Sequence, residues 1–137
     1  MFKLSPTGTE TVLHSFTGAA DGGYPEASLI RDAAGNLYGT TQFGGANDQG
    51  VVFKLSPTGT LTLLYSFTGG ADGQRPIAGL IQDPAGNLYG TTWEGGAESS
   101  ACANPTCGVV FKLSPDGTET CSTPSLGERT EEVPPLV

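Results

Sequence analysis

Few residues of this chain could perform acid–base or nucleophilic chemistry. His14 is the single histidine, and the matching residue 51 positions later is Tyr65, which favours a packing role for both. A Ser-His-Asp triad also needs an exposed serine, and no G-x-S-x-G elbow is present. Glycine-rich stretches such as Gly44-Gly45 lack the lysine and the strand-to-helix context of a phosphate loop. The sequence therefore predicts no catalytic residue and no cofactor.

Acidic residues recur at fixed places, as they also do in calcium sites. Asp32 and Asp83 precede the same Gly-Asn-Leu-Tyr string, and Asp21 and Asp72 each precede a glycine in a longer loop. Calcium prefers several clustered oxygen ligands, whereas each of these motifs offers one carboxylate. Because aspartate also closes turns by hydrogen-bonding the backbone, we expect turn capping and no metal site.

The chain contains three cysteines, and two of them flank an inserted segment. Cys102 and Cys107 are separated by four residues, and a disulfide between them would pin the elongated loop and fit an oxidising compartment. Free thiols are the alternative. The spacing is not C-x₂-C and no histidine lies nearby, so zinc is not expected. Cys121 is left unpaired or intermolecular.

An internal repeat organises the chain. Residues 2–46 align with residues 53–97 without a gap and are identical at 33 of 45 positions. The string Phe-Lys-Leu-Ser-Pro returns at 111–115 after an insertion of seven residues. We expect a tandem β-repeat region over residues 1–120, with units that start near residues 2, 53 and 111. A divergent, proline-rich tail over 121–137 is expected to be disordered.

Each unit holds four strand candidates separated by turn signals. Asp32-Ala33-Ala34-Gly35 and Ser56-Pro57-Thr58-Gly59 predict tight hairpins, because proline presets φ and glycine accepts a positive φ. Strands joined in this way are antiparallel neighbours. The expected strands are 27–31, 36–41, 50–55 and 60–67, with 9–16 as an earlier copy of the last.

Apolar side chains are expected on both faces of each sheet. Val52 lies opposite Phe53 in one strand, and in the next strand Leu63 and Tyr65 are expected to share one face with Leu64 opposite. A lone antiparallel sheet has one wet face and clean alternation. Burial on both faces predicts an all-β, propeller-like array of tandem four-stranded antiparallel blades, with a β-sandwich as the alternative.

The number of repeats has a physical consequence. About two and a half blades cannot close a ring, because propellers contain about 4–8 blades. Open blade faces and strand edges would meet water. We therefore expect either a fragment that lacks further repeats or a self-associating chain.

The positions at which the repeats differ cluster in the two longer loops, which a propeller places on one rim. A constant scaffold with variable loops suits ligand binding, although neutral drift of exposed loops is the alternative. The residues expected to contact a ligand are the aromatics Trp93, Tyr24 and Phe43, with Arg75, Asn47 and Asp48 as polar neighbours.

Composition and charge exclude several partners. The net charge is −8, so the basic footprint of a nucleic-acid-binding protein is missing. No apolar run approaches the roughly 18 residues of a membrane span. No signal peptide is visible, because repeat sequence follows Met1 at once.

The strings Gly-Val-Val-Phe-Lys-Leu-Ser-Pro-Asp-Gly-Thr, Ser-Phe-Thr-Gly and Gly-Asn-Leu-Tyr-Gly-Thr-Thr resemble the tandem GloVer repeat family, the choice-of-anchor repeat proteins of bacteria. The resemblance covers about residues 1–120. It implies a secreted or surface-anchored propeller-like protein with several more repeats and a sorting anchor, which is not visible in this sequence. It supplies no catalytic residues to transfer.

Three functional hypotheses follow. The leading one is a non-catalytic extracellular module that presents variable loops to a glycan or a protein. The second is part of a carbohydrate-active hydrolase or lyase that uses loop carboxylates. The third is a structural surface spacer, which predicts no pocket.

Overall fold

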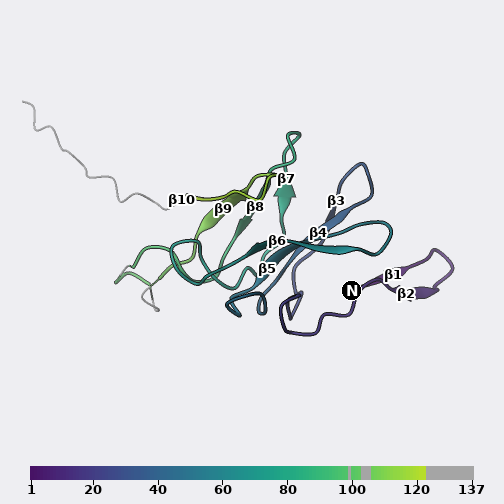
Figure 1. Cartoon of the computed structure of the whole chain (residues 1–137), viewed down its shortest axis with the longest axis horizontal. Coiled ribbons are helices and arrows are strands. Elements are labelled where there is room, and N and C mark those ends of the chain that lie inside the picture. Colours follow the sequence, from purple (N-terminus) through teal and green to yellow (C-terminus); the bar gives the residue numbers. More distant parts are fainter. Residues whose placement is uncertain (99, 103–105, 123–137) are drawn as a thin grey trace, which may run out of the picture.

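The computed structural model describes residues 1–98, 100–102 and 106–122. These residues form ten β-strands and no helix, arranged as three antiparallel sheets (Figure 1). The strands are β1 (Phe2–Leu4), β2 (Glu10–Val12), β3 (Ile30–Arg31), β4 (Leu37–Thr41), β5 (Val51–Leu55), β6 (Leu61–Ser66), β7 (Ile81–Gln82), β8 (Leu88–Thr91), β9 (Val110–Leu113) and β10 (Glu119–Ser122). The all-β, antiparallel prediction is confirmed for the described residues.

The repeat builds the same sheet twice. Strands β3 to β6 pair in chain order as one four-stranded sheet, and β7 to β10 pair in chain order as another. The hairpin β1–β2 has the register of the last two strands of each sheet, since Leu4 faces Glu10 just as Leu113 faces Glu119. The described chain is therefore one hairpin followed by two complete four-stranded sheets.

Turn chemistry fixes the short connections. The Asp32 carboxylate accepts hydrogen bonds from the Asn36 amide nitrogen at 2.9 Å and from Asn36 Nδ2 at 2.8 Å, and Asp83 repeats both bonds with Asn87. Because the charged carboxylate accepts these bonds, chiefly that from the Asn36 side chain, the pKa of Asp32 is lowered. The capping role expected for these aspartates is confirmed.

The hairpin between β5 and β6 closes in a second way. Gly59 adopts a φ of +89° and its amide donates to the Ser56 carbonyl, while the Thr60 amide donates to Ser56 Oγ.

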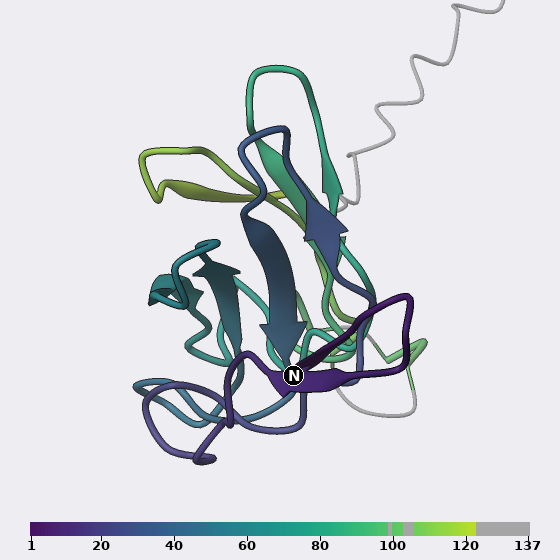
Figure 2. The same ribbon diagram turned by 90° about the vertical axis from the view of Figure 1, so that its right-hand side faces the viewer.

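Figure 2 shows the turns that contain Asp32 and Asp83 at one end of the molecule and the longer loops at the other.

Two predicted strands are much shorter than expected. Residues 27–29 do not join the sheet, and β3 pairs with β4 only from Ile30 onward. Strand β2 ends at Val12 rather than near residue 16, since its partner β1 starts at Phe2 and beyond it only the Met1 carbonyl accepts the amides of Leu13 and His14.

A β-bulge overturns the predicted faces of β6. Phe53 pairs with Leu63, but the neighbouring Val52 pairs with Tyr65, so Leu64 is an extra residue in the ladder. Because residues paired across a ladder share a face, Leu63 and Tyr65 lie on opposite faces, contrary to the expectation. Leu64 and Tyr65 both pack against the cluster around Val52. At the other end of the chain, β10 includes Cys121 and Ser122, while the rest of the segment 121–137 lies outside the described residues.

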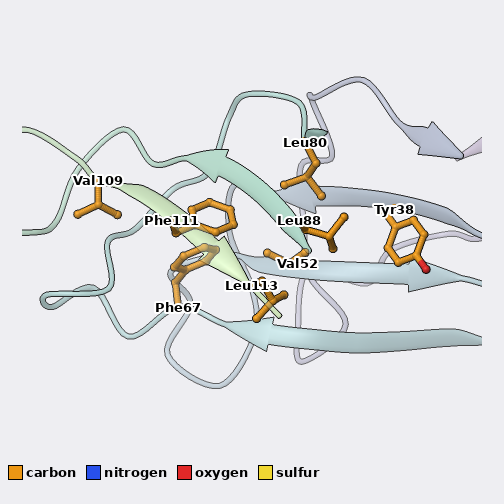
Figure 3. Close-up of a cluster of buried hydrophobic side chains, with 8 residues drawn as sticks. All are labelled: Tyr38, Val52, Phe67, Leu80, Leu88, Val109, Phe111 and Leu113. Carbon is orange, nitrogen blue, oxygen red and sulfur yellow. The ribbon is translucent and has the colours of Figure 1, made fainter. Parts of the chain in front are cut away.

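The two four-stranded sheets pack face to face through one apolar cluster (Figure 3). We call the side of a sheet that carries Phe53 or Phe111 its Phe face, and the side that carries Val52 or Val110 its Val face. The Val face of β3–β6 packs on the Phe face of β7–β10. The cluster consists of Tyr38, Val52 and Phe67 from the first unit and of Leu80, Leu88, Val109, Phe111 and Leu113 from the second.

Aromatic pairs join consecutive units in the same way at both junctions. Phe67 meets Phe111 edge to face with ring centroids 5.1 Å apart, and Phe16 meets Phe53 at the same distance. The Phe111 ring lies against Gly90 of the neighbouring strand, where a Cβ would approach its Cζ to 2.6 Å. Glycine at this position therefore makes room for the ring.

Phe111→Ala should lower the free energy of unfolding by about 3–5 kcal/mol, because it removes a ring that is 1% exposed and leaves a cavity. Chemical denaturation followed by circular dichroism measures the loss. Phe2→Ala is the matched control at the same repeat position, where the ring is 62% exposed. It should change the free energy by less than about 0.5 kcal/mol. Equal losses at both positions would contradict the packing described above.

Candidate functional site

The two longer loops of each unit meet as short extended pairs. Gly23 forms a bridge with Phe43 in the first unit, and Gln74 forms the matching bridge with Glu94 in the second. The first of these loops is folded locally, because the Asp21 carboxylate accepts hydrogen bonds from the amide and hydroxyl of Thr17. These bonds, led by that from the Thr17 side chain, lower the pKa of Asp21.

Three of the predicted binding residues form one cluster across the junction between units. The rings of Tyr24 and Phe43 are 5.6 Å apart in an edge-to-face arrangement. The guanidinium of Arg75, which comes from the next unit, lies 5.3 Å from the Phe43 centroid as a cation–π contact. The Arg75 amide donates to the Gln49 carbonyl at 2.9 Å, which ties the second unit's loop to the first unit. We call Tyr24, Phe43 and Arg75 the rim cluster.

Trp93 lies beside the rim cluster along the backbone. Its amide donates to the Arg75 carbonyl at 3.1 Å, just as Gln42 donates to Tyr24 in the first unit. Tyr24 is 67% exposed and Trp93 is 61% exposed, so both rings are available to a ligand. The structure therefore brings four of the six predicted residues to neighbouring loop positions.

Asn47 and Asp48 have other contacts. Asp48 Oδ1 accepts a hydrogen bond from the Gly44 amide at 2.8 Å, and Asn47 Nδ2 donates to the Phe67 carbonyl at 3.5 Å. These bonds close the loop onto itself and onto the sheet. Both residues are exposed, but their hydrogen bonds serve the loop rather than the rim cluster.

The backbone at this rim is strained. Within the described chain, non-glycine residues with positive φ are Tyr24 at 57°, Asp48 at 55° and Arg75 at 55°. Aspartate tolerates this region, whereas tyrosine and arginine pay a steric cost of about 1–2 kcal/mol. Tyr24 and Arg75 occupy the same repeat position, so the fold demands this conformation and the chain places bulky side chains there. Strain of this kind concentrates at functional sites.

An ion pair holds the Arg75 guanidinium in place, but one of its nitrogen atoms lacks a hydrogen-bond partner within the described residues. Its Nη1 lies 3.5 Å from Glu94 Oε2, an oxygen that also accepts a hydrogen bond from Gln74 Nε2. The Nε atom of Arg75 is buried and has no hydrogen-bond partner within the described residues. A buried donor without a partner costs free energy.

Two grooves between consecutive units escaped the sequence analysis. Each has a volume of about 650 Å³ and opens beside the tight turns, away from the rim cluster. Their walls contain repeat-equivalent residues. These are Lys3, Leu13, Leu37, Leu55 and Pro57 in one groove, and Lys54, Leu64, Leu88, Leu113 and Pro115 in the other. The repeated Phe-Lys-Leu string could have predicted these grooves. Its lysine points to the face of the strand opposite the phenylalanine, and that face borders the groove.

The cysteines and the histidine have structural partners. Cys102 and Cys107 form a disulfide with their Cα atoms 5.6 Å apart. His14 Nε2 lies 3.2 Å from Asp21 Oδ2, and the matching Tyr65 hydroxyl donates to Asp72 at 2.9 Å. The histidine thus occupies a place that tyrosine fills equally well, which supports a positional role.

Neither a metal group nor a membrane helix appears in the described part of the chain. No set of three or more His, Cys, Asp or Glu side chains there lies close enough to hold a metal ion. None of its elements is a helix of the length and apolarity that would cross a membrane.

A hairpin followed by two copies of one sheet, joined by equivalent aromatic contacts, defines an all-β tandem-repeat protein. The family model described as the Gloeobacter/Verrucomicrobia repeat matches residues 1–132. The chain belongs to this repeat family, as its motifs indicated. No curated protein matches the chain.

An acidic residue between the sheets has unusual surroundings. Burial, reinforced by the charge of Asp72, raises the pKa of Glu119 above its ordinary value of 4.5. Its Oε1 accepts a hydrogen bond from Cys121 Sγ at 2.8 Å, and burial together with this carboxylate raises the pKa of the thiol to about 12. Cys121 is therefore a protonated thiol at neutral pH.

Glu119→Gln should raise the midpoint temperature of unfolding at pH 7 and have a smaller effect near pH 4. The folded state favours protonated Glu119, so this contribution is present at low pH and is lost as the pH rises through the raised pKa. Thermal melts at both pH values measure the difference. Glu10→Gln is the control, since Glu10 holds the same repeat position on the exposed hairpin. A stabilisation that is independent of pH would argue against this account.

Tyr24→Asn should change the free energy of unfolding by less than about 1 kcal/mol, although it removes a large aromatic side chain. Asparagine adopts positive φ more readily, and this gain offsets the lost ring contact of about 0.5–1.5 kcal/mol. Tyr38→Asn is the comparison, because that ring is buried in the core and its hydroxyl donates to Asp32. It should cost at least about 3 kcal/mol in the same denaturation experiment. A loss of that size at Tyr24 would show that the ring holds the loop.

Proposed function

We propose that this chain is a non-catalytic binding module in which the rim cluster and Trp93 contact a glycan or protein ligand. The observation that carries the proposal is the strained conformation of Tyr24 and Arg75. Residues with bulky side chains keep an unfavourable backbone where glycine or asparagine would fit better. Stability alone would not select tyrosine and arginine at these positions.

The chemistry of the rim suits both ligand classes. The exposed ring faces of Tyr24 and Trp93 can stack on the C–H faces of a sugar, and the Arg75 guanidinium can donate paired hydrogen bonds to a carboxylate or to hydroxyl groups. Tyrosine, tryptophan and arginine are also the residue types that dominate the binding energy of protein interfaces. Since Arg75 comes from the second unit and Tyr24 from the first, a ligand would bridge two repeats.

The packing supports a propeller-like arrangement of these units. A two-sheet sandwich buries one face of each sheet and leaves the other face wet. Here the sheet β3–β6 buries both faces, since Val52 and Phe53 are fully buried on opposite sides. The same Val-face-to-Phe-face contact also recurs at two junctions, which is the relation that radial repetition requires.

A secreted or cell-surface location, which the resemblance of the motifs to choice-of-anchor repeat proteins implies, belongs to the same proposal. The disulfide between Cys102 and Cys107 supports it, because disulfides persist in oxidising compartments. The pair closes a loop on the side of the longer connections, where a surface module would need protection from local unfolding.

The enzymatic alternative would need two carboxylates arranged around a pocket. Glu119 has a raised pKa, but it lies between the sheets rather than at the rim. No specific observation therefore favours hydrolase or lyase chemistry over binding.

Trp93→Ala and Tyr24→Ala should each weaken binding of an identified ligand at least tenfold, a loss typical of an aromatic anchor. The ligand is first found by probing the purified chain on a glycan array and in pull-downs, and affinity is then measured by calorimetry. Phe2→Ala is the control, because it removes an equally exposed ring that does not belong to the rim cluster. Unchanged affinity in both rim variants would refute the site. Failure of both screens would favour the structural spacer.

A further inference from the structure

The sheet β7–β10 presents its Val face to solvent. Val110 is 52% exposed and Ile81 is 69% exposed on this face. Their counterparts in β3–β6 are Val52, which is fully buried, and Ile30, which packs against the apolar cluster. The difference arises because the next Phe face covers the first sheet, while no part of the described chain covers the second.

The opposite end of the molecule carries the complementary surface. In Figure 1 the hairpin β1–β2 projects at one end and the sheet β7–β10 lies at the other. Phe2 is 62% exposed and Leu4 is 61% exposed on the Phe face of this hairpin. At the same repeat positions in the second sheet, Phe111 and Leu113 are buried against the Val face of the first sheet.

We propose that these two surfaces bind one another between copies of the chain, with the β1–β2 hairpin of one copy docked on the Val face of β7–β10 of the next. The chain already makes this contact internally, where a Phe and a Leu two residues apart on one strand pack on a valine and an isoleucine of the preceding unit. Within the described residues, the hairpin leaves the Phe and Leu half of this contact uncovered, and the sheet β7–β10 leaves the Val and Ile half uncovered. The occupant of the open Val face is therefore a second copy, bound head to tail.

The polarity of this contact determines the kind of assembly. A heterologous interface leaves one hairpin and one Val face free after every addition, so it yields a series of oligomers or a closed ring rather than a symmetric dimer. The net charge of −8 opposes the approach of two copies, whereas the contact itself is apolar. Added salt should therefore strengthen the association by screening the repulsion.

Sedimentation velocity of the full chain over a hundredfold concentration range tests the proposal. The average mass should rise with concentration, and should rise further at higher salt. Val110→Asp blocks the Val face and Phe2→Asp blocks the hairpin, so each variant alone should remain monomeric. An equimolar mixture should form dimers and nothing larger, since one copy keeps its hairpin and the other keeps its Val face. Thr58→Asp, which adds the same charge in an exposed turn, should associate like the original chain.

Several outcomes would overturn the proposal. These are a monomer at every concentration, association of Val110→Asp equal to that of the original chain, or a variant mixture that remains monomeric. The last result would indicate a symmetric contact instead. Val110→Thr keeps the β-branched shape of the strand residue and should weaken association at least tenfold, so the test does not depend on aspartate being tolerated in β9. Circular dichroism melts confirm that each variant is folded.

Discussion

The aromatic contact between consecutive units is the constraint on which the rest of the structure depends. The hairpin β1–β2 and the sheet β3–β6 are each followed by a phenylalanine that reaches forward to the phenylalanine of the next unit's third strand. Phe16 reaches Phe53 and Phe67 reaches Phe111, both with centroids 5.1 Å apart. The receiving ring fits only because the adjacent strand carries glycine, at Gly39 and Gly90. A short sheet with two apolar faces cannot stay folded in water alone, so this contact makes each unit depend on its neighbour.

The same dependence explains where variation is tolerated. Substitutions within the sheet β3–β6 would disturb two junctions at once, because this sheet packs against a unit on both of its sides. The longer loops lie outside the stacked faces and are held by their own backbone bonds and by aspartate caps. The repeats can therefore differ at Tyr24 and Arg75, or insert the loop closed by Cys102 and Cys107, without altering the packed strands. The rim cluster forms where a variable loop of one unit meets a variable loop of the next.

Much of the scaffold could be predicted from the sequence because its determinants are local. Asp32 and Gly35, or Ser56 and Gly59, specify their turns without reference to the rest of the chain, and the alternation around Val52 and Phe53 specifies two buried faces. The bulge at Leu64 could not be predicted in this way. Its position depends on which residue of β6 meets Val52 across the ladder, and no residue type marks it.

The candidate site was likewise predictable only where local sequence determines it. Comparing the repeats identified the loops that differ, and so identified Tyr24, Phe43, Arg75 and Trp93. It could not show that Arg75 crosses to the preceding unit, because that contact depends on how consecutive sheets pack. Nor could it show the positive φ of Tyr24 and Arg75, since glycine, asparagine and aspartate are the usual sequence signals for it. Bulky residues in that conformation are informative because they carry a steric cost that glycine or asparagine would avoid. Their side chains project from a junction that packing has already made rigid, so a ligand there would meet preorganised groups and lose little entropy on binding.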